Sequence, residues 1–219
     1  MKFKVLVSAL ILFFSVNARA QSSVYKKAGE IQIKDHKATM AGTIRNGGDL
    51  FKIDLMDVGK VDGHICGCNT AGFLMTKKVL GLLFPNQIPV RNTVRVFVSE
   101  YNRDLMDAIG YITGIRLNTG MYTHSENEMS VDKSLAGKPG TSILVFERKD
   151  NGKKVKVILD KSHLLSKYEM QTIATIKPKI MAHKATAAEK KQYAEVTRAI
   201  VKKEITHMPS GAITYQLLD

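Results

Sequence analysis

The sequence contains no tryptophan, few other aromatic residues and only two cysteines among its 219 residues. No stretch interleaves aromatic residues with arginine as single-strand-binding proteins do, which argues against nucleic acid as a partner. The sequence also lacks a Ser-His-Asp order, a glycine-rich phosphate loop and a paired-carboxylate motif. Internal repeats and low-complexity tracts are absent as well. These absences leave a globular chain whose chemistry must come from a less common motif.

Only the N-terminus carries a long apolar run. Lys2 and Lys4 precede an apolar segment at residues 5–16, and residues 18–20 read Ala-Arg-Ala. This pattern is typical of a secretory signal peptide cleaved before Gln21, with an uncleaved anchor as the alternative. No later segment is apolar enough to span a bilayer, and no cysteine lies near the cleavage point for lipid attachment. We therefore expect a soluble mature chain without a transmembrane segment, located in the periplasm or secreted.

Basic residues outnumber acidic ones, 33 to 20, and the formal net charge is +13. Removal of residues 1–20 takes away three bases and no acids, which lowers the net charge to +10. Such a charge favours association with anions, anionic lipid or acidic partners. Because much of the excess is lysine scattered along the C-terminal half, a solvated basic surface is the plainer interpretation.

The two cysteines, Cys66 and Cys68, are one residue apart and follow His64 closely. In an oxidising compartment two cysteines would ordinarily form a disulfide. A single intervening residue allows only a strained bond, which would be labile and redox-active rather than structural. A bound metal would instead protect both thiolates. The spacing therefore favours a metal site and leaves a redox pair as the alternative.

The His-x-Cys-x-Cys stretch offers up to three ligands of the kinds that zinc accepts. Structural zinc sites need four ligands, and this spacing is not that of a zinc finger, so any further ligand comes from elsewhere in the chain. A site with fewer protein ligands would keep one position open to water or substrate. Two plainer interpretations remain: Cys66 packs as a small apolar side chain, and His64 bonds a loop backbone.

A second polar cluster occupies residues 122–128 and contains His124. Together with Glu126 or Glu128, this histidine would add a metal ligand or an acid/base pair. A solvated loop is the alternative, because loops are polar by default.

Hydrophobic periodicity predicts a mixed α+β fold in a single domain. Strands are predicted at 31–34, 93–100, 142–148, 154–159 and 213–218, and helices at 69–83, 103–113, about 162–178 and 186–205. Residues 50–57 form a strand or a helix, and residues 115–141 are mostly loop. An Asn-Gly turn joins the two strands of a hairpin at 142–159. Pro178 ends or kinks the third helix.

The helix predicted at 69–83 begins just after the cysteines, and Asn69 or Thr70 is expected to cap it. Its N-terminus carries a partial positive charge that favours the thiolate form of Cys66 and Cys68. Both a metal ligand and a nucleophile need that form.

The order of these motifs resembles the FmdE family, which is named for a protein associated with formylmethanofuran dehydrogenase. Gly-His-Ile-Cys at 63–66 is followed by a helix, then Glu100, then Asp-Ala-Ile-Gly-Tyr-Ile-Thr-Gly at 107–114, then a hairpin. The resemblance covers about residues 50–219, and the stretch 107–114 is its most specific part.

The chain departs from the family pattern at several positions. The family reads His-Gly-His-x-Cys-Pro-Gly, whereas here Asp62 replaces the first histidine and Gly-Cys at 67–68 replaces Pro-Gly. Asp104 and Ile115 stand where the family has cysteines. The cysteine-rich zinc ribbon that ends many members is absent.

By resemblance, His64 and Cys66 are metal ligands and Asp107 supports the helix that faces them. Asp104 then replaces a lost cysteine as an oxygen ligand, and Cys68 replaces a lost thiolate. The resemblance also implies an α+β core and a homodimer.

We therefore expect a signal peptide at 1–20, a polar N-terminal extension at 21–49 and an FmdE-like metal-binding domain at 50–219. The expected function is an exported protein that binds a transition metal, with zinc as the first choice, in an accessory or metal-handling role. The alternatives are a metal-dependent enzyme and a Cys66/Cys68 thiol–disulfide redox protein. Whether the chain catalyses a reaction is left open.

Overall fold

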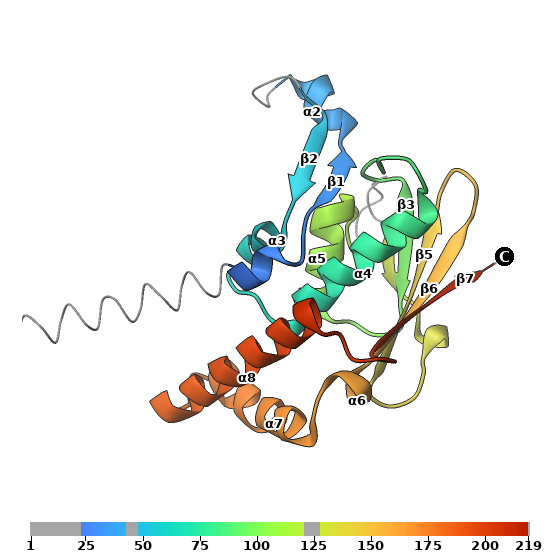
Figure 1. The fold of residues 1–219 in the computed structure, drawn as a ribbon. Helices are drawn as coiled ribbons and strands as arrows, with labels where there is room; N and C mark the ends of the chain where they lie inside the picture. The colour runs from blue at the N-terminus through green and yellow to red at the C-terminus, as the bar shows by residue number, and fades with distance from the viewer. Residues whose placement is uncertain (1–22, 43–47, 121–127, 219) are drawn as a thin grey trace, which may run out of the picture.

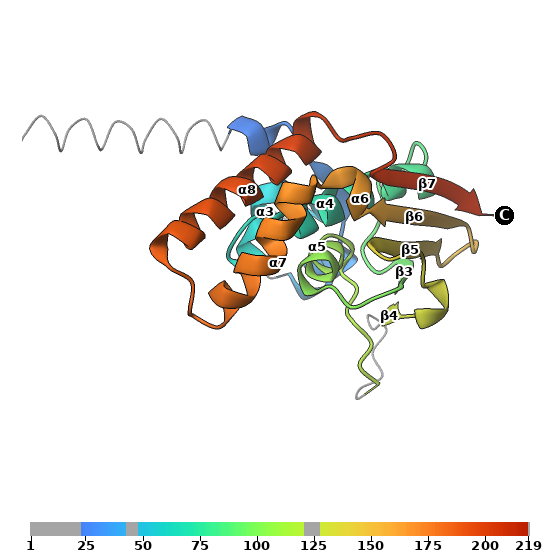
Figure 2. The ribbon, with the colours of Figure 1, turned by 90° about the horizontal axis from the view of Figure 1, so that it is seen from below.

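The computed structural model of the chain describes residues 23–42, 48–120 and 128–218. A five-stranded sheet in the order β4-β3-β5-β6-β7 forms one side of the molecule (Figure 2). Its strands are β3 (Val94–Val98), β4 (Met129–Val131), β5 (Thr141–Arg148), β6 (Lys154–Asp160) and β7 (Ile213–Leu218). β4 runs parallel to β3, and all other neighbours are antiparallel. The hairpin expected from the Asn-Gly turn is the β5–β6 pair.

Two long helices, α4 (Gly67–Leu83) and α5 (Arg103–Thr113), pack against each other beside this sheet (Figure 1). Alternate residues of β3 and β6 are buried, as expected for strands with one face on a core. The largest fully buried side chains come from both helices and from the strands and include Phe73, Met75, Leu83, Leu105, Ile109, Ile112, Leu144 and Phe146. One core therefore fixes the N-terminal ends of α4 and α5, where the candidate ligands lie.

A smaller antiparallel sheet joins β1 (Ile31–Lys34) to β2 (Leu50–Ile53). The short helix α2 (His36–Ala41) follows β1, and α3 (Leu55–Asp62) follows β2. Residues 50–57, predicted as a strand or a helix, thus contain parts of both. Asp54 separates them because its side chain accepts from the backbone of Asp57 and begins α3 as a capping box.

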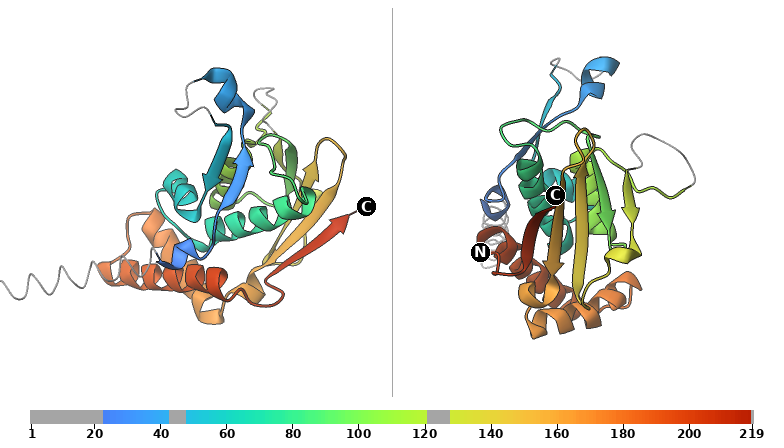
Figure 3. Two further views of the ribbon diagram at one scale, coloured as in Figure 1. Left: turned by 45° about the horizontal axis from the view of Figure 1, so that its top comes forward. Right: turned by 90° about the vertical axis from the view of Figure 1, so that its right-hand side faces the viewer.

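The C-terminal third contains α6 (Lys161–Leu164), α7 (Lys167–Met181) and α8 (Ala187–Thr206). The single helix predicted from residue 162 is wrong, because Ser166 and Glu169 form a capping box that begins α7 anew. α7 ends at Met181, about one turn after Pro178. α8 packs on both α7 and α4, so the C-terminal helices cover the start of α4 (Figure 3).

The predicted α+β class and single mixed domain are confirmed, and the bounds of α5 match the prediction. α4 begins at Gly67 rather than Asn69, and its N-cap is Cys66 rather than Asn69 or Thr70. The 3-10 turn η1 (Lys133–Leu135) and β4 lie in the segment predicted as mostly loop. None of the described helices is both long enough and apolar enough to traverse a bilayer. The predicted signal peptide and His124 lie outside the described residues.

Candidate metal centre

Three of the predicted ligands converge at the N-terminal ends of α4 and α5. One ligand atom each from His64, Cys66 and Asp104 lies within 4.8 Å of the other two. Cys66 and Asp104 are buried and His64 is exposed, so the cluster lies at the edge of the core with one side toward solvent. Cys66 Sγ and Asp104 Oδ2 are 3.6 Å apart although 38 residues separate them in sequence. The packing of α4 on α5 therefore creates the cluster.

The loop that carries His64 and Cys66 is held by the buried side chain of Asn69. Gly63, at φ 70°, ends α3 in the left-handed conformation that glycine adopts without strain, and the chain then turns into α4. The Asn69 amide oxygen accepts from the Cys66 backbone N–H at 2.9 Å. Its NH2 group donates to the His64 carbonyl at 2.9 Å and to Asp62 Oδ2 at 3.3 Å. One side chain thus fixes the backbone on both sides of the cluster.

The ring of His64 is oriented by a backbone contact. Its Nδ1 lies 3.0 Å from the carbonyl oxygen of Asp62. If Nδ1 carries the proton and donates to that carbonyl, Nε2 is left with a lone pair for a metal. Metal-binding histidines commonly make this kind of bond, which fixes the tautomer and the ring plane.

Asp104 is kept ionised in spite of its burial. Burial raises the pKa of this carboxyl, but the adjacent Arg103 guanidinium, together with the charges of Lys177 and His64, outweighs it, and the net pKa lies below the ordinary value. Arg103 donates from Nε and Nη2 to Asp104 Oδ1 at 3.1 and 2.9 Å. The other oxygen, Oδ2, faces Cys66. An anionic oxygen is therefore available on the side of the cluster.

The two cysteines are both free thiols, and their side chains lie next to each other. A hydrogen bond from Cys66 lowers the pKa of Cys68 to about 6 despite burial, and Asn102 Nδ2 donates to Cys68 Sγ at 3.6 Å. The same bond to Cys68, together with burial, raises the pKa of Cys66. Cys68 is therefore the more acidic thiol of the pair. It lies beside Cys66 in the first turn of α4, outside the group of three ligand atoms.

A buried carboxyl from α8 lies on the other side of the same turn. Glu204 is 2% exposed, and neither of its side-chain oxygens has a hydrogen-bond partner among the residues that the structure describes. It packs so closely on Gly67 that a Cβ placed there would lie 3.3 Å from Glu204 Oε1. Burial raises the pKa of Glu204 well above its ordinary value, and the charge of Cys68 adds to this effect. Lys203 opposes it only in part.

The donor set of imidazole nitrogen, cysteine sulfur and carboxylate oxygen matches zinc chemistry. In a tetrahedral zinc site, ligand atoms are about 3.3–3.8 Å apart, because the bonds are about 2.0–2.3 Å long. The three atoms, all within 4.8 Å of one another, need to draw in by at most about 1.5 Å to close on an ion. The residues present therefore fit a transition metal with three protein ligands.

Asp107 and Glu128, which were also predicted to take part in the site, are not members of the three-residue cluster. Asp107 lies on α5, where burial and the nearby Asp62 raise its pKa. Glu128, from the second polar cluster, forms ion pairs with Arg95 and Lys149. The rest of that cluster, residues 121–127, lies outside the described residues.

Sequence reasoning missed two residues that shape the site. Asn69 was expected as a helix cap, and nothing in the sequence shows that its amide holds the preceding loop. Glu204 had a signal, since it follows Val196, Ile200 and Val201 on the apolar face of α8. A carboxylate at such a position is a candidate for burial.

Comparison with known families and proteins gives one match. The model of the family described as FmdE, Molybdenum formylmethanofuran dehydrogenase operon, matches residues 61–214. No curated protein and no solved structure matches the chain. The matched region includes α4, α5, strands β3 to β6 and the helices α7 and α8, and it contains all three members of the cluster. Because this match covers more than half of the chain, the protein belongs to the FmdE family.

Proposed function

We propose that this FmdE protein binds one zinc ion through His64 Nε2, Cys66 Sγ and Asp104 Oδ2. The observation that carries the proposal is the convergence of one ligand atom from each of these three residues within 4.8 Å at the ends of two packed helices. The Asn69 amide accepts a hydrogen bond from the Cys66 backbone, and the Arg103 guanidinium donates to Asp104, so both ligands are held in position by neighbouring side chains. Such outer contacts commonly support metal affinity.

The fourth position is either open or taken by Cys68. In the structure Cys68 Sγ contacts Asn102 and Cys66 and lies outside the cluster. If it turns toward the ion, the site closes with four protein ligands, as structural zinc sites do. If it stays with Asn102, water occupies the position, and zinc lowers the pKa of a bound water toward neutrality. The first arrangement supports a metal-handling or accessory role, and the second supports a metal-dependent enzyme.

A competition titration of Zn²⁺ against a chromophoric chelator tests the proposal. The wild-type chain should bind one Zn²⁺ per chain, and His64→Ala and Asp104→Asn should each weaken binding tenfold or more. His207→Ala is the matched control, because His207 is exposed at the end of α8, and it should bind as wild type. Cys68→Ser decides the fourth position: a large loss means that Cys68 is a ligand. Equal affinity in His64→Ala and His207→Ala would contradict the ligand set.

A redox pair is the second candidate function, favoured by the hydrogen bond between the two thiols and the lowered pKa of Cys68. A thiolate of this kind is reactive. Thiol titration and disulfide mapping of the purified chain separate the two candidates. Metal binding predicts thiols masked by the ion and released by chelation, whereas a redox pair predicts a reversible Cys66–Cys68 bond.

We further propose that the chain is exported to the periplasm or the medium after loss of residues 1–20, and that it forms a homodimer. The family resemblance supports the dimer, and the N-terminal sequence pattern supports export. Intact mass of the mature protein, which should begin at Gln21, and light scattering of the purified chain test these two statements separately.

A further inference from the structure

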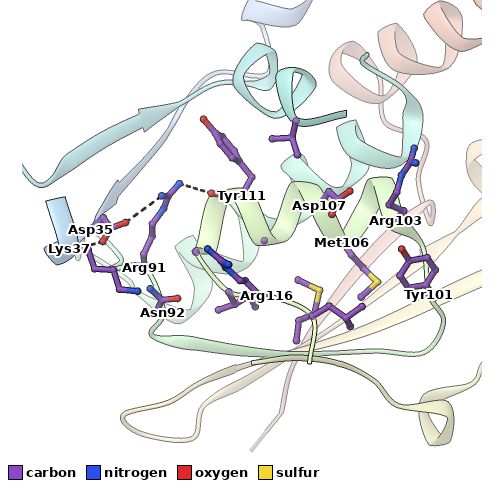
Figure 4. A pocket seen from close by; sticks show the side chains of 16 residues that line it. Asp35, Lys37, Arg91, Asn92, Tyr101, Arg103, Met106, Asp107, Tyr111 and Arg116 are labelled. Carbon is purple, nitrogen blue, oxygen red and sulfur yellow. Dashed lines mark hydrogen bonds and ion pairs between the residues drawn. The ribbon is translucent and has the colours of Figure 1, made fainter. Parts of the chain in front are cut away.

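A cavity of about 580 Å³ lies along the outer face of α5, next to the candidate metal centre (Figure 4). Its volume is in the range of small-molecule binding sites. One end is formed by Lys37, Arg91, Asn92 and Arg116, and the other by residues such as Arg103 and Asp107. The charged side chains of the lining are four bases and two acids, so the cavity favours an anion.

Arg91 is a fixed part of the wall. Its guanidinium donates to the carbonyls of Tyr111 and Ile112 at 2.5 and 3.2 Å, and its Nη1 lies 3.4 Å from Asp35 Oδ2. It also stacks over the rings of Phe51 and Tyr111. With its charge partly matched by Asp35, Arg91 shapes this end of the cavity and is not the group most available to a ligand.

Arg116 is the available cation at this end. Its guanidinium has no hydrogen bond or ion pair with any residue in the described parts of the chain, although it lines the cavity. A planar guanidinium without a partner matches the two oxygens of a carboxylate.

Asn92 supplies a second polar group that lacks a hydrogen-bond partner within the described residues. Its side-chain oxygen is buried and has no hydrogen-bond partner among the residues that the structure describes. Its backbone lies in the left-handed region at φ 65°, and the residue lines the cavity. A buried polar atom without a partner carries a free-energy penalty that a ligand or its bound water can remove.

The middle of the cavity is apolar. Met106, Ile115, Leu117 and Met129 line it between the two polar ends. At the far end Arg103 contacts both the cavity and Asp104, so the cavity reaches the residue that supports a proposed metal ligand. A ligand of this shape needs an anionic head and an apolar body.

We propose that this cavity binds a small organic carboxylate, with the carboxylate on Arg116 and the apolar chain along Met106 and Met129. The proposal goes beyond the metal site and does not depend on it, because no cavity-lining residue is one of the three proposed ligands.

The test uses metal-free mature protein, prepared by passage over a chelating resin so that no chelator competes for the cavity. ¹⁵N-labelled protein is titrated with sodium hexanoate at constant ionic strength and followed by amide chemical shifts. Hexanamide, which has the same length and no charge, is the control compound. Arg116→Ala removes the proposed contact, and Arg198→Ala is the control variant, because Arg198 is an exposed arginine on α8.

We expect saturable shifts at Asn92, Gly114 and Leu117 with hexanoate and none with hexanamide. Loss of one charged hydrogen-bonding group should weaken binding about tenfold in Arg116→Ala and leave Arg198→Ala unchanged. The amide spectrum itself shows whether each variant is folded, and Arg116→Lys, which keeps the charge, should retain part of the affinity. Absence of saturable shifts, equal binding of hexanamide, or equal loss in both alanine variants would overturn the proposal.

Discussion

Replacement of Glu204 by glutamine should change how stability depends on pH. The carboxyl of Glu204 is buried and has no hydrogen-bond partner within the described parts of the chain, and burial together with the charge of Cys68 raises its pKa well above the ordinary value. Glutamine has nearly the same shape and carries no charge at any pH. The variant therefore keeps the packing on Gly67 and removes the protonation equilibrium of the carboxyl at residue 204.

The sign follows from proton linkage. Because the folded pKa lies above the unfolded value, the folded chain retains a proton that the unfolded chain releases above about pH 4.5. The contribution of this proton to the unfolding free energy is complete below that pH and is lost as pH rises toward the folded pKa. Between the two pKa values the loss approaches about 1.4 kcal/mol per pH unit. Glu204→Gln lacks this loss, so its advantage over wild type should grow as pH rises.

Urea unfolding of metal-free wild type, Glu204→Gln and Glu195→Gln at pH 5, 6, 7 and 8 measures the effect. Glu195 is an exposed glutamate on the same helix and serves as the matched control. We expect Glu204→Gln to gain about 1 kcal/mol or more over wild type between pH 5 and 6, and Glu195→Gln to follow wild type. Parallel pH profiles for all three proteins would refute the assignment of a neutral buried carboxyl.

Three further predictions concern packing and charge. Gly72→Ala should lower the free energy of unfolding by about 1–3 kcal/mol in urea, because its Cβ would lie 3.0 Å from the Leu105 carbonyl. Gly81, also on α4, has open space around it, so Gly81→Ala should raise the free energy of unfolding by about 0.5–1 kcal/mol. Asn69→Ala should lower the unfolding free energy by about 2–3 kcal/mol and weaken Zn²⁺ binding in the chelator competition, because it removes three hydrogen bonds at the site loop. Burial raises the pKa of Glu169, but Lys203 and the hydrogen bonds from Ser166 outweigh it, so the net pKa is lowered. The stability that this ionised carboxyl contributes should therefore be lost in acid below about pH 4.5. Glu169→Gln should show a smaller acid-induced fall in melting temperature.

Local patterns predicted most of the fold. The apolar spacing of α5 and the glycine after it define that helix within the sequence itself, and the Asn-Gly turn defines the β5–β6 hairpin. The break between α6 and α7 was missed, because the periodicity runs through Ser166 and only its hydrogen bonds with Glu169 reveal the new start. β4 was missed for a related reason: three residues form a strand only because β3 lies beside them.

The residues of the candidate metal centre likewise fall into those that the sequence predicts and those whose position depends on tertiary packing. His64 and Cys66 stand out in the sequence because they are metal-binding residue types close together. Asp104 entered only through the family resemblance, since its contact with Cys66 depends on how α5 packs on α4. Glu204 comes from the far end of the chain, and its burial depends on how α8 covers the first turn of α4. Contacts of this kind are properties of tertiary packing and are not encoded in local spacing.

The metal content of the mature chain, purified without an affinity metal and measured by mass spectrometry, tests the metal centre most directly. Cys66→Ser is measured beside wild type, because this substitution removes the buried thiol and leaves the neighbouring cysteine in place. About one metal ion per wild-type chain, absent from Cys66→Ser, is the result that the convergence of His64, Cys66 and Asp104 predicts. Metal-free wild type with Cys66 and Cys68 joined in a disulfide would contradict the metal centre and leave the redox pair as the function of this site.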